Sequence, residues 1–336
     1  MDKVVITNWV HAETIGVLAP HAEVDWNAER GRIWNRSEIL TRARNATALM
    51  VFMNDCVDAT FLDACPDLKI LAAALKGYDN FDVAACSARG IWVTNVADLL
   101  TAPTAELTIG LMIALSRNML AGDRHIRAGE FRGWQPAFYG TGLEGSSVGL
   151  IGFGAIGQAI ARRLSGFGCR IQYCDERPDE PCRETEKDAV RTDLDRLLSS
   201  SDFIVVAVPL TPATHHLIDA KAVSRMRIGS FLVNPARGSV VDEAAVAAAL
   251  ESGHLAGYAA DVFEMEDWAR GDRPNSIAPG LIDAPSATVL TPHIGSAATP
   301  VRRAIEREAA INILAALRGE RPPGAVNEPV CGVSAC

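Results

Sequence analysis

Three ionisable residues in the second half of the chain stand just after predicted β-strands. Arg237 lies in Asn-Pro-Ala-Arg-Gly-Ser, Glu266 in Asp-Val-Phe-Glu-Met-Glu and His293 in Thr-Pro-His-Ile-Gly-Ser. The loops after the strands of a parallel sheet share one edge, so these residues can converge there. Hydride transfer on an anion needs a cation to hold it, a base to move a proton and a carboxylate to orient that base. Each residue alone also fits a structural role, as an ion-pair member, a solvated acid or a buried histidine.

A glycine-rich turn predicts where a dinucleotide binds. Gly152, Gly154 and Gly157 form the pattern G-x-G-x-x-G between a short apolar strand and a helix with one apolar face. In such a turn the first glycine allows a tight bend, the second lets a pyrophosphate approach the backbone, and the third lets the helix pack on the strand. An isolated pattern also fits an ordinary glycine-rich turn. The second strand and its terminal acid complete a βαβ unit, which favours dinucleotide binding.

Asp175 ends the second strand of that unit. A carboxylate here accepts hydrogen bonds from the ribose hydroxyls of NAD and repels the 2′-phosphate of NADP. The sequence therefore predicts NAD as the cofactor. Arg177 stands close enough to weaken this preference, which leaves NADP as a weaker alternative.

Length and composition limit the classes of function. A chain of 336 residues with 49% hydrophobic residues is long enough for two domains, each with its own core. It has no apolar run of membrane-spanning length and no signal-peptide pattern, so we expect a soluble, cytoplasmic protein that binds no membrane. The net charge of -9, without a Lys/Arg cluster, argues against a nucleic-acid partner. The eight cysteines form no C-x-x-C pair, so neither disulfides nor a metal site is expected.

The periodicity of apolar residues predicts alternating strands and helices, as in parallel sheets covered by helices on both faces. A long helix with Pro103 near its start and apolar positions as far as Leu120 is expected to lead into the second domain. Residues 177–187 are polar and turn-rich, and the tail from Pro322 has little pattern. The predicted strands are 4–7, 48–53, 70–74, 91–95, 148–151, 171–175, 203–208, 230–234, 257–261 and 288–290, and the predicted helices include 11–18, 37–43, 59–65, 83–88, 243–251 and one around 305–314.

A loop rich in aromatic residues and glycine covers residues 129–142. It has two interpretations of equal weight, which do not exclude each other. Trp134 and Tyr139 could pack against a neighbouring subunit, or they could stand at the mouth of an active site.

Four motifs resemble the signatures of the D-2-hydroxyacid dehydrogenases, in the same order. They are residues 145–162 and the segments around Arg237, Glu266 and His293. The resemblance extends over essentially the whole chain. It implies an α/β fold of two Rossmann-like domains with doubly wound parallel sheets. A discontinuous, flavodoxin-like substrate-binding domain, residues 1–99 and 296–336, would flank an NAD-binding Rossmann domain, residues 100–295. The resemblance also implies a homodimer.

The same resemblance assigns roles to individual residues. Arg237, Glu266 and His293 match the catalytic residues of the family one by one. The positions implied for cofactor binding are Lys76, Gly77, Leu100, Thr104, Gly152, Gly154, Ala155, Ile156, Gly157, Asp175, Ala207, Pro209, Pro235, Ala236, Arg237, Asp261, His293 and Gly295.

Lys76 departs from the pattern of the hydroxyacid enzymes, which usually carry a small apolar residue before the Gly-x-Asp-Asn run. Within the family, phosphonate dehydrogenases have a lysine here, and the run Lys-Gly-Tyr-Asp-Asn-Phe-Asp is similar to theirs. An ammonium group suits a compact, highly charged anion. Asn54, where a proline is expected, and Pro300 depart from that subgroup. The residues implied for substrate binding are Lys76, Gly77, Met53, Arg237, Ser296, Arg302, Trp134 and Tyr139.

These features predict an NAD-dependent phosphite dehydrogenase, with phosphite as the small-molecule partner and His293 as the base that activates water. A second interpretation is an NAD-dependent D-2-hydroxyacid dehydrogenase that reduces 2-oxo acids, for which the same arginine, glutamate and histidine would serve. A third is a corepressor-like protein that binds NAD without catalysis.

Overall fold

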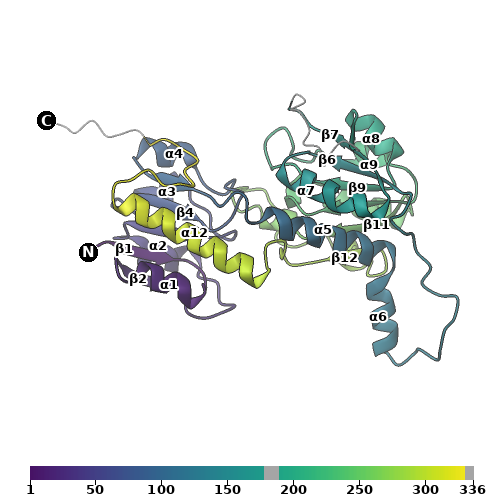
Figure 1. The fold of residues 1–336 in the computed structure, drawn as a ribbon, viewed down its shortest axis with the longest axis horizontal. Coiled ribbons are helices and arrows are strands. Elements are labelled where there is room, and N and C mark those ends of the chain that lie inside the picture. Colours follow the sequence, from purple (N-terminus) through teal and green to yellow (C-terminus); the bar gives the residue numbers. More distant parts are fainter. Residues whose placement is uncertain (178–188, 330–336) are drawn as a thin grey trace. The chain divides into compact units, whose positions relative to one another are not determined.

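The computed structural model describes residues 1–177 and 189–329 (Figure 1). The chain forms two compact units. Unit 1 combines Met1–Leu100, Trp268–Gly271 and the chain from Ala297 on, and unit 2 combines Thr101–Asp267 with Asp272–Ser296. The predicted polar segment lies, after Arg177, outside the described residues, as do Cys182, Cys331 and Cys336.

Unit 1 is built on a five-stranded sheet in the order β2-β1-β3-β4-β5. All of its strand pairs are parallel. Its central strands are continuous apolar runs, because both faces of a parallel sheet are covered. The strands are β1 (Lys3–Ile6), β2 (Glu23–Trp26), β3 (Ala48–Val51), β4 (Ile70–Ala73) and β5 (Trp92–Thr94).

Helices cover both faces of this sheet. One face packs on α1 and α12 through apolar residues that include Leu18, Ile305 and Ile313, and the other packs on α2, α3 and α4. Asn35 caps α2 through a reciprocal pair of hydrogen bonds with Glu38, which satisfies amide groups that have no partner within the helix. The helices are α1 (Ala12–Leu18), α2 (Arg36–Ala43), α3 (Ala59–Asp63), α4 (Val83–Ala88) and α12 (Thr299–Leu317).

Unit 2 is built on a seven-stranded sheet in the order β12-β11-β10-β9-β6-β7-β8, also with parallel pairs. The order reverses between β6 and β9. Ligands bind at such a reversal, beyond the carboxyl ends of the strands. The strands are β6 (Ser147–Ile151), β7 (Arg170–Cys174), β8 (Ala189–Arg191), β9 (Phe203–Val206), β10 (Ser230–Asn234), β11 (Leu255–Ala260) and β12 (Thr288–Leu290).

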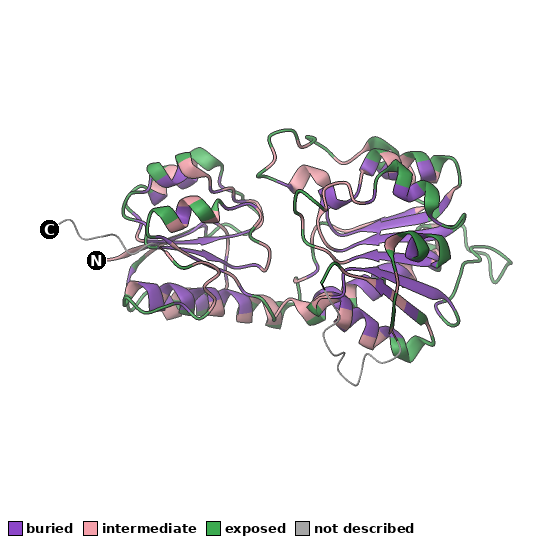
Figure 2. Cartoon of the chain, turned by 90° about the horizontal axis from the view of Figure 1, so that it is seen from above, coloured by how far each residue is buried: buried purple, intermediate pink, exposed green. Residues whose placement is uncertain are grey.

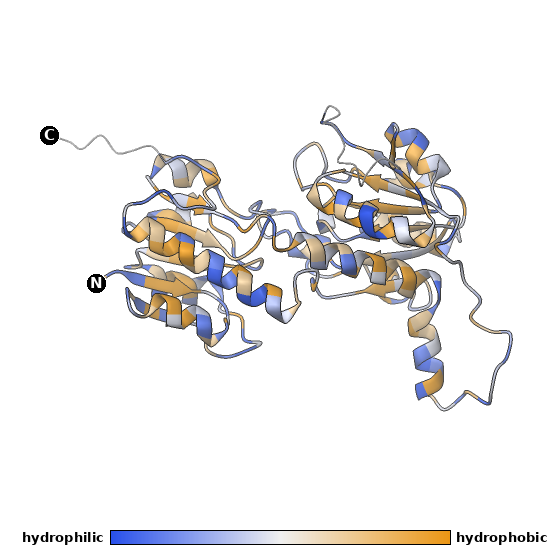
Figure 3. Ribbon diagram, viewed as in Figure 1, coloured by the Kyte–Doolittle hydropathy of each residue, from blue (hydrophilic) through white to orange (hydrophobic). Residues whose placement is uncertain are grey.

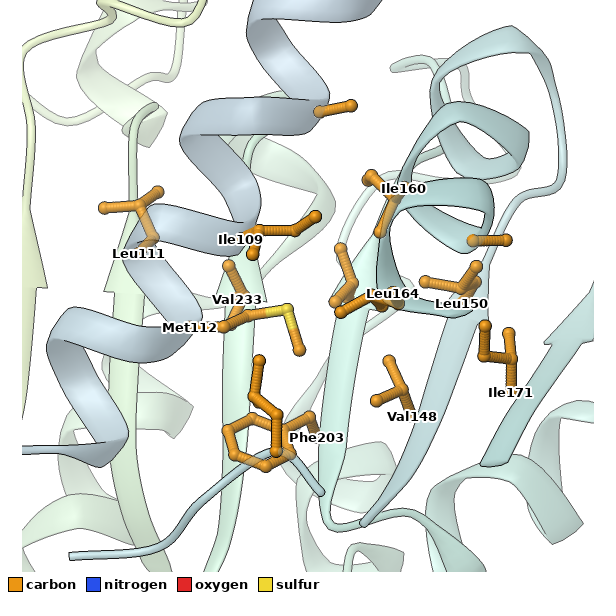
Figure 4. Close-up of a cluster of buried hydrophobic side chains, with 14 of the residues drawn as sticks. Ile109, Leu111, Met112, Val148, Leu150, Ile160, Leu164, Ile171, Phe203 and Val233 are labelled. Carbon is orange, nitrogen blue, oxygen red and sulfur yellow. The ribbon is translucent and has the colours of Figure 1, made fainter. Parts of the chain in front are cut away.

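Two hydrophobic cores lie on the two faces of this sheet, and alternate residues of one strand serve different cores. Val148 and Leu150 pack with α5 and α7 (Figure 4), whereas Ile151 packs with the helices of the other face. The central strands of both units are accordingly buried (Figure 2) and apolar (Figure 3). The helices are α5 (Thr101–Ser116), α6 (Met119–Arg127), α7 (Ala155–Leu164), α8 (Leu194–Ser200), α9 (Ala220–Arg225), α10 (Glu243–Glu251) and α11 (Pro279–Ile282), with short 3-10 helices η1 (Ser165–Phe167), η3 (Gly238–Val240) and η4 (Glu264–Glu266).

The predicted α/β fold class, with two doubly wound parallel sheets, is confirmed. The prediction of a single long helix as far as Leu120 was wrong, because α5 ends at Ser116 and α6 starts at Met119. The carbonyl of Ser116 accepts a hydrogen bond from Thr141 N at 2.8 Å, and Asn118 adopts a left-handed φ of 54°. A returning loop therefore takes the acceptor that a continuing helix would use.

Two strands, β2 and β8, were not predicted. Both stand at an edge of a sheet. Edge strands have one solvated side and tolerate polar residues, so Glu23–Trp26 lacks the apolar run that marks the central strands. In the described part of the chain, no helix is long and apolar enough to cross a bilayer.

Candidate active site

The glycine turn after β6 is shaped as a dinucleotide fingerprint requires. Gly152 has φ 95°, and a Cβ on it would lie 2.6 Å from Ala207 O. A Cβ on Gly157 would collide with Gly152 O, so this glycine lets α7 start close to the strand. Gly154 caps α7, and the nearest atom to a Cβ there is Arg177 Nη2 at 3.6 Å. Two glycines thus serve packing, and the third leaves the approach to the helix amino end open.

Asp175 lies beside this turn and is already bound on both oxygens. Phe153 N donates to Oδ2 at 2.7 Å, Arg177 N donates to Oδ1 at 2.9 Å, and Arg177 Nε and Nη2 donate to the two oxygens at 3.0 Å each. The Arg177 hydrogen bonds lower the pKa of Asp175 to about 2, against the effect of burial. The carboxylate therefore stays ionised as an acceptor, and Arg177 lies where the sequence analysis expected it to weaken the preference for NAD.

These residues fit a dinucleotide. The first turn of α7 presents backbone N–H groups that no helical acceptor satisfies, and the open side of Gly154 allows a phosphate to approach them. Asp175 adds an ionised acceptor at the next strand end. Among the described residues, no group of His, Cys, Asp and Glu side chains is arranged to hold a metal ion.

His293 and Glu266 form a hydrogen-bonded pair in unit 2. Glu266 Oε2 lies 2.8 Å from His293 Nδ1, and Glu266 Oε1 accepts from Phe263 N at 2.8 Å. An ionised carboxylate only accepts, so Nδ1 carries the hydrogen and Nε2 is left to exchange a proton. The side chains are 28% and 27% exposed, so a substrate can reach the pair.

Asp261 holds the loop that carries His293. It is 1% exposed, and its carboxylate accepts from Thr291 Oγ1 at 2.6 Å, Ile294 N at 2.8 Å and Gly295 N at 2.7 Å. Burial raises its pKa, while these hydrogen bonds act in the opposite direction. His293 itself has φ 54°, which is uncommon for a residue other than glycine. The structure thus gives Asp261 a positioning role that the sequence analysis missed.

Arg237 follows β10 and lies next to the segment that carries Glu266. Asn234, fully buried at the end of β10, donates to Arg237 O at 2.9 Å and accepts from Ala236 N at 3.1 Å. A Cβ on Gly238 would collide with the backbone of Phe263 and Glu264. This contact of two backbones brings the Arg237 loop and the Glu266 loop together, as the common sheet edge predicts.

Lys76 lies in unit 1, shortly after β4. Burial lowers the pKa of its ammonium group, and the nearby charge of Asp98 opposes this effect. Asn95 Nδ2 donates to Lys76 O at 2.7 Å, which fixes the backbone of this loop. Arg302, in the first turn of α12, donates to Ala74 O at 3.3 Å, and burial lowers its pKa as well.

The remaining predicted residues are placed as follows. Met53 packs against a core of unit 1, and its carbonyl accepts from Asn80 Nδ2 at 2.8 Å. Asn54, the departure from the expected proline, accepts from Asn8 Nδ2 at 2.9 Å. Trp134 and Tyr139 are 84% and 75% exposed in unit 2. Gly77 and Leu100 belong to unit 1, and Thr104, Ala155, Ile156, Ala207, Pro209, Pro235, Ala236, Gly295 and Ser296 belong to unit 2.

A family model decides the relationship. The model of the NAD-binding domain of the D-isomer specific 2-hydroxyacid dehydrogenases matches residues 109–295, more than half of the chain. The chain belongs to this family. It is an NAD-dependent oxidoreductase of the D-2-hydroxyacid dehydrogenase family, and the predicted cofactor, NAD, is confirmed.

Relatives of this dehydrogenase match over nearly its whole length. A glyoxylate reductase of Thermococcus onnurineus is 38% identical and aligns with 98% of this chain and 97% of its own. The crystal structure of the TT0316 protein from Thermus thermophilus has a TM-score of 0.87 at 33% identity, covering 97% of this chain and all of its own. A glyoxylate reductase from Paecilomyes thermophila has a TM-score of 0.83 at 28% identity, covering 97% and 98%.

The comparisons contradict the phosphite interpretation. Relatives that align with nearly the whole chain, among them those of Thermococcus onnurineus and Pyrococcus furiosus, are named glyoxylate reductase, so the second interpretation of the sequence is the better supported one. An ammonium group attracts a carboxylate as well as an inorganic anion, so Lys76 alone does not distinguish the two.

Proposed function

We propose that this dehydrogenase reduces a small 2-oxo acid such as glyoxylate to the corresponding 2-hydroxy acid. The hydrogen-bonded pair of His293 and Glu266 carries the proposal, because carbonyl reduction needs a proton donor whose orientation is held. The names of the full-length relatives support glyoxylate as the first substrate to test.

In the proposed reaction, a 2-oxo acid, a hydride and a proton combine to a 2-hydroxy acid. NADH, when bound, supplies the hydride that reaches the carbonyl carbon. The Nε2 of protonated His293 donates its proton to the carbonyl oxygen, and Glu266 stabilises the imidazolium through Nδ1. Arg237 binds the carboxylate of the substrate, for which its planar guanidinium is suited. In the direction of oxidation His293 acts as the base.

The contribution of Lys76, Gly77, Met53, Ser296 and Arg302 to substrate binding is part of this proposal. The two cations, Lys76 and Arg302, support it most. Burial lowers the pKa of both, against the effect of the Asp98 and Glu306 carboxylates, so holding the two positive charges carries a desolvation cost. A bound carboxylate would offset that cost.

An assay of purified protein tests the function. We expect NADH absorbance to fall on addition of glyoxylate, and to fall more slowly or not at all with larger 2-oxo acids. The same assay with NADPH shows how far Arg177 weakens the preference for NADH. Failure to turn over any 2-oxo acid, or oxidation of phosphite with NAD in its place, would overturn the proposal. Retained NAD binding without any turnover would replace it with the third interpretation, a binding protein.

We also propose a homodimer that uses α6 and the loop after it. No residue of α6 is buried, and it extends away from the sheet of unit 2 (Figure 1). Its exposed apolar side chains include Leu120 and Ile126, and Trp134 and Tyr139 follow in the loop. Apolar side chains gathered on one projecting element favour burial against a second copy. Sedimentation equilibrium should give twice the chain mass, and a monomer at micromolar concentration would contradict this.

A further inference from the structure

We propose that Glu264 is a positioning residue for the reaction, and that with His216 and Glu243 it fixes the short helix η4 that carries Glu266. These three residues are called the Glu264 cluster below. The inference rests on the proposed function. It concerns residues of unit 2 that do not themselves take part in the proposed reaction.

Glu264 and Glu243 are joined by a reciprocal pair of hydrogen bonds. Glu264 N donates to Glu243 Oε1 at 2.8 Å, and Glu243 N donates to Glu264 Oε1 at 3.0 Å. Glu243 is the first residue of α10, so each carboxylate satisfies a backbone amide of the other segment. Two bonds in opposite directions fix both the distance and the rotation of η4 relative to α10.

Glu243 is itself held in place by burial and hydrogen bonds. It is 3% exposed, and its second oxygen accepts from Ala278 N at 2.9 Å. Burial raises its pKa, and the hydrogen bonds from Ala278 and Glu264 oppose that effect. The carboxyl group therefore ties three separate segments of unit 2 together at one point.

His216 completes the cluster from another loop. Its Nε2 lies 2.9 Å from Glu264 Oε2, and its backbone N donates to Ser239 O at 2.8 Å. His216 adopts φ 47°, and its ring stacks on that of His215 with centroids 4.0 Å apart. A residue other than glycine keeps a left-handed conformation only where its surroundings hold it, so this histidine is a fixed partner.

The cluster acts on Glu266 through a short and rigid connection. Glu264 and Glu266 are the first and last residues of η4, and Ser239 N donates to Asp267 Oδ2 at 2.8 Å on its far side. Gly238, which follows Arg237, packs directly on the backbone of Phe263 and Glu264. Both ends of η4 are therefore held against the Arg237 loop. A displacement of about 1 Å in such a site lowers turnover by roughly a hundredfold, so holding η4 matters for the 2.8 Å contact of Glu266 with His293.

The experiment compares Glu264→Ala with Glu264→Gln. Alanine removes both side-chain bonds. Glutamine keeps an acceptor for Glu243 N and offers an amide donor to His216. Glu251→Ala is the matched control, because Glu251 is the exposed last residue of α10. For glyoxylate reduction we expect kcat of Glu264→Ala to fall by about tenfold with the KM for NADH unchanged. Glu264→Gln should recover most of kcat, and the control should equal the wild type.

A second measurement does not depend on activity. Imidazole ¹⁵N chemical shifts of His293, assigned by their absence in His293→Ala, report which ring nitrogen carries the proton. Glu266 and Asp261 are the charged groups that act on this ring. We expect the wild type and Glu264→Gln to hold the hydrogen on Nδ1 and Glu264→Ala to show mixed tautomers.

Unchanged kcat and unchanged His293 shifts in Glu264→Ala would overturn the positioning role, as would equal losses in the alanine and glutamine variants. If the wild type reduces no 2-oxo acid, the proposed function fails. The ¹⁵N shifts still decide whether Glu264 orients the pair.

Discussion

The carboxyl edges of the two sheets differ in how their charged groups are held. In unit 2, Asp261 accepts hydrogen bonds from Thr291, Ile294 and Gly295, and Glu266 accepts from Phe263 and His293. These bonds set the position of His293. In unit 1, Lys76 and Arg302 are cations whose pKa values are both lowered by burial. Two parallel sheets thus carry an ordered histidine–glutamate pair at one edge and partly desolvated cations at the other. The chemistry at the edge of a sheet depends on the residues that follow its strands. The fold only places those residues close to one another.

The largest effect is expected at the ordered edge. His293→Ala should lower kcat for glyoxylate reduction by about 10²–10⁴-fold, because a positioned general acid contributes that much. NADH binding, measured by fluorescence titration, should be retained. Turnover close to that of the wild type would mean that another group supplies the proton.

Gly152→Ala tests the turn of the same unit. The left-handed φ and the contact with Ala207 O should together cost about 3 kcal/mol of unfolding free energy. Gly110→Ala is the control, since no atom lies within 4 Å of a Cβ there and α5 is helical. It should be neutral or raise stability by up to about 1 kcal/mol. Equal denaturation midpoints for both variants would show that the turn tolerates a side chain.

Lys76→Ala tests the cationic edge. Losing one charge-assisted hydrogen bond of about 1.5 kcal/mol should raise the KM for glyoxylate by about tenfold, with kcat much less affected. Substitutions in unit 2 should then change mainly kcat, whereas substitutions of the unit 1 cations should change mainly KM. A loss confined to kcat would remove the distinction.

Arg177→Ala should have the smallest effect, and one that depends on pH. In the wild type the pKa of Asp175 is about 2, below its ordinary 3.8, so the stabilisation is present above about pH 4 and is lost as pH falls towards 2. Because Arg177 is exposed, we expect a loss of at most about 1 kcal/mol. Urea unfolding near pH 6 should show the whole difference, and unfolding near pH 3, about midway between the two pKa values, should show about half of it. A difference that is equal at both pH values would show that Arg177 does not act through Asp175.

Much of the site could be predicted because its signals are local. The three glycines of the turn stand within one short segment, and a Cβ on two of them, Gly152 and Gly157, would collide with the backbone. Arg237, Glu266 and His293 each follow a strand, so the rule that strand ends share an edge was enough to bring them together. Glu266 and His293 do form a direct contact.

Other features could not be predicted because they depend on partners distant in sequence. The break before α6 comes from Thr141, which donates to Ser116 O. The role of Asp261 depends on amides more than thirty residues further along the chain. The prediction of phosphite as the substrate was wrong because a lysine attracts many kinds of anion and does not reveal which one is bound.

The amino-acid sequence by itself determined the strand and helix periodicity, the glycine turn and which ionisable residues follow the strands of unit 2. These follow from the shape and charge of single residues and their near neighbours. Only the tertiary structure decided that Asp261 orders the His293 loop and that Glu243 and Glu264 join α10 to η4. Hydrogen bonds have a short range and a strict direction, so which amide meets which carboxylate is settled only when the segments have packed.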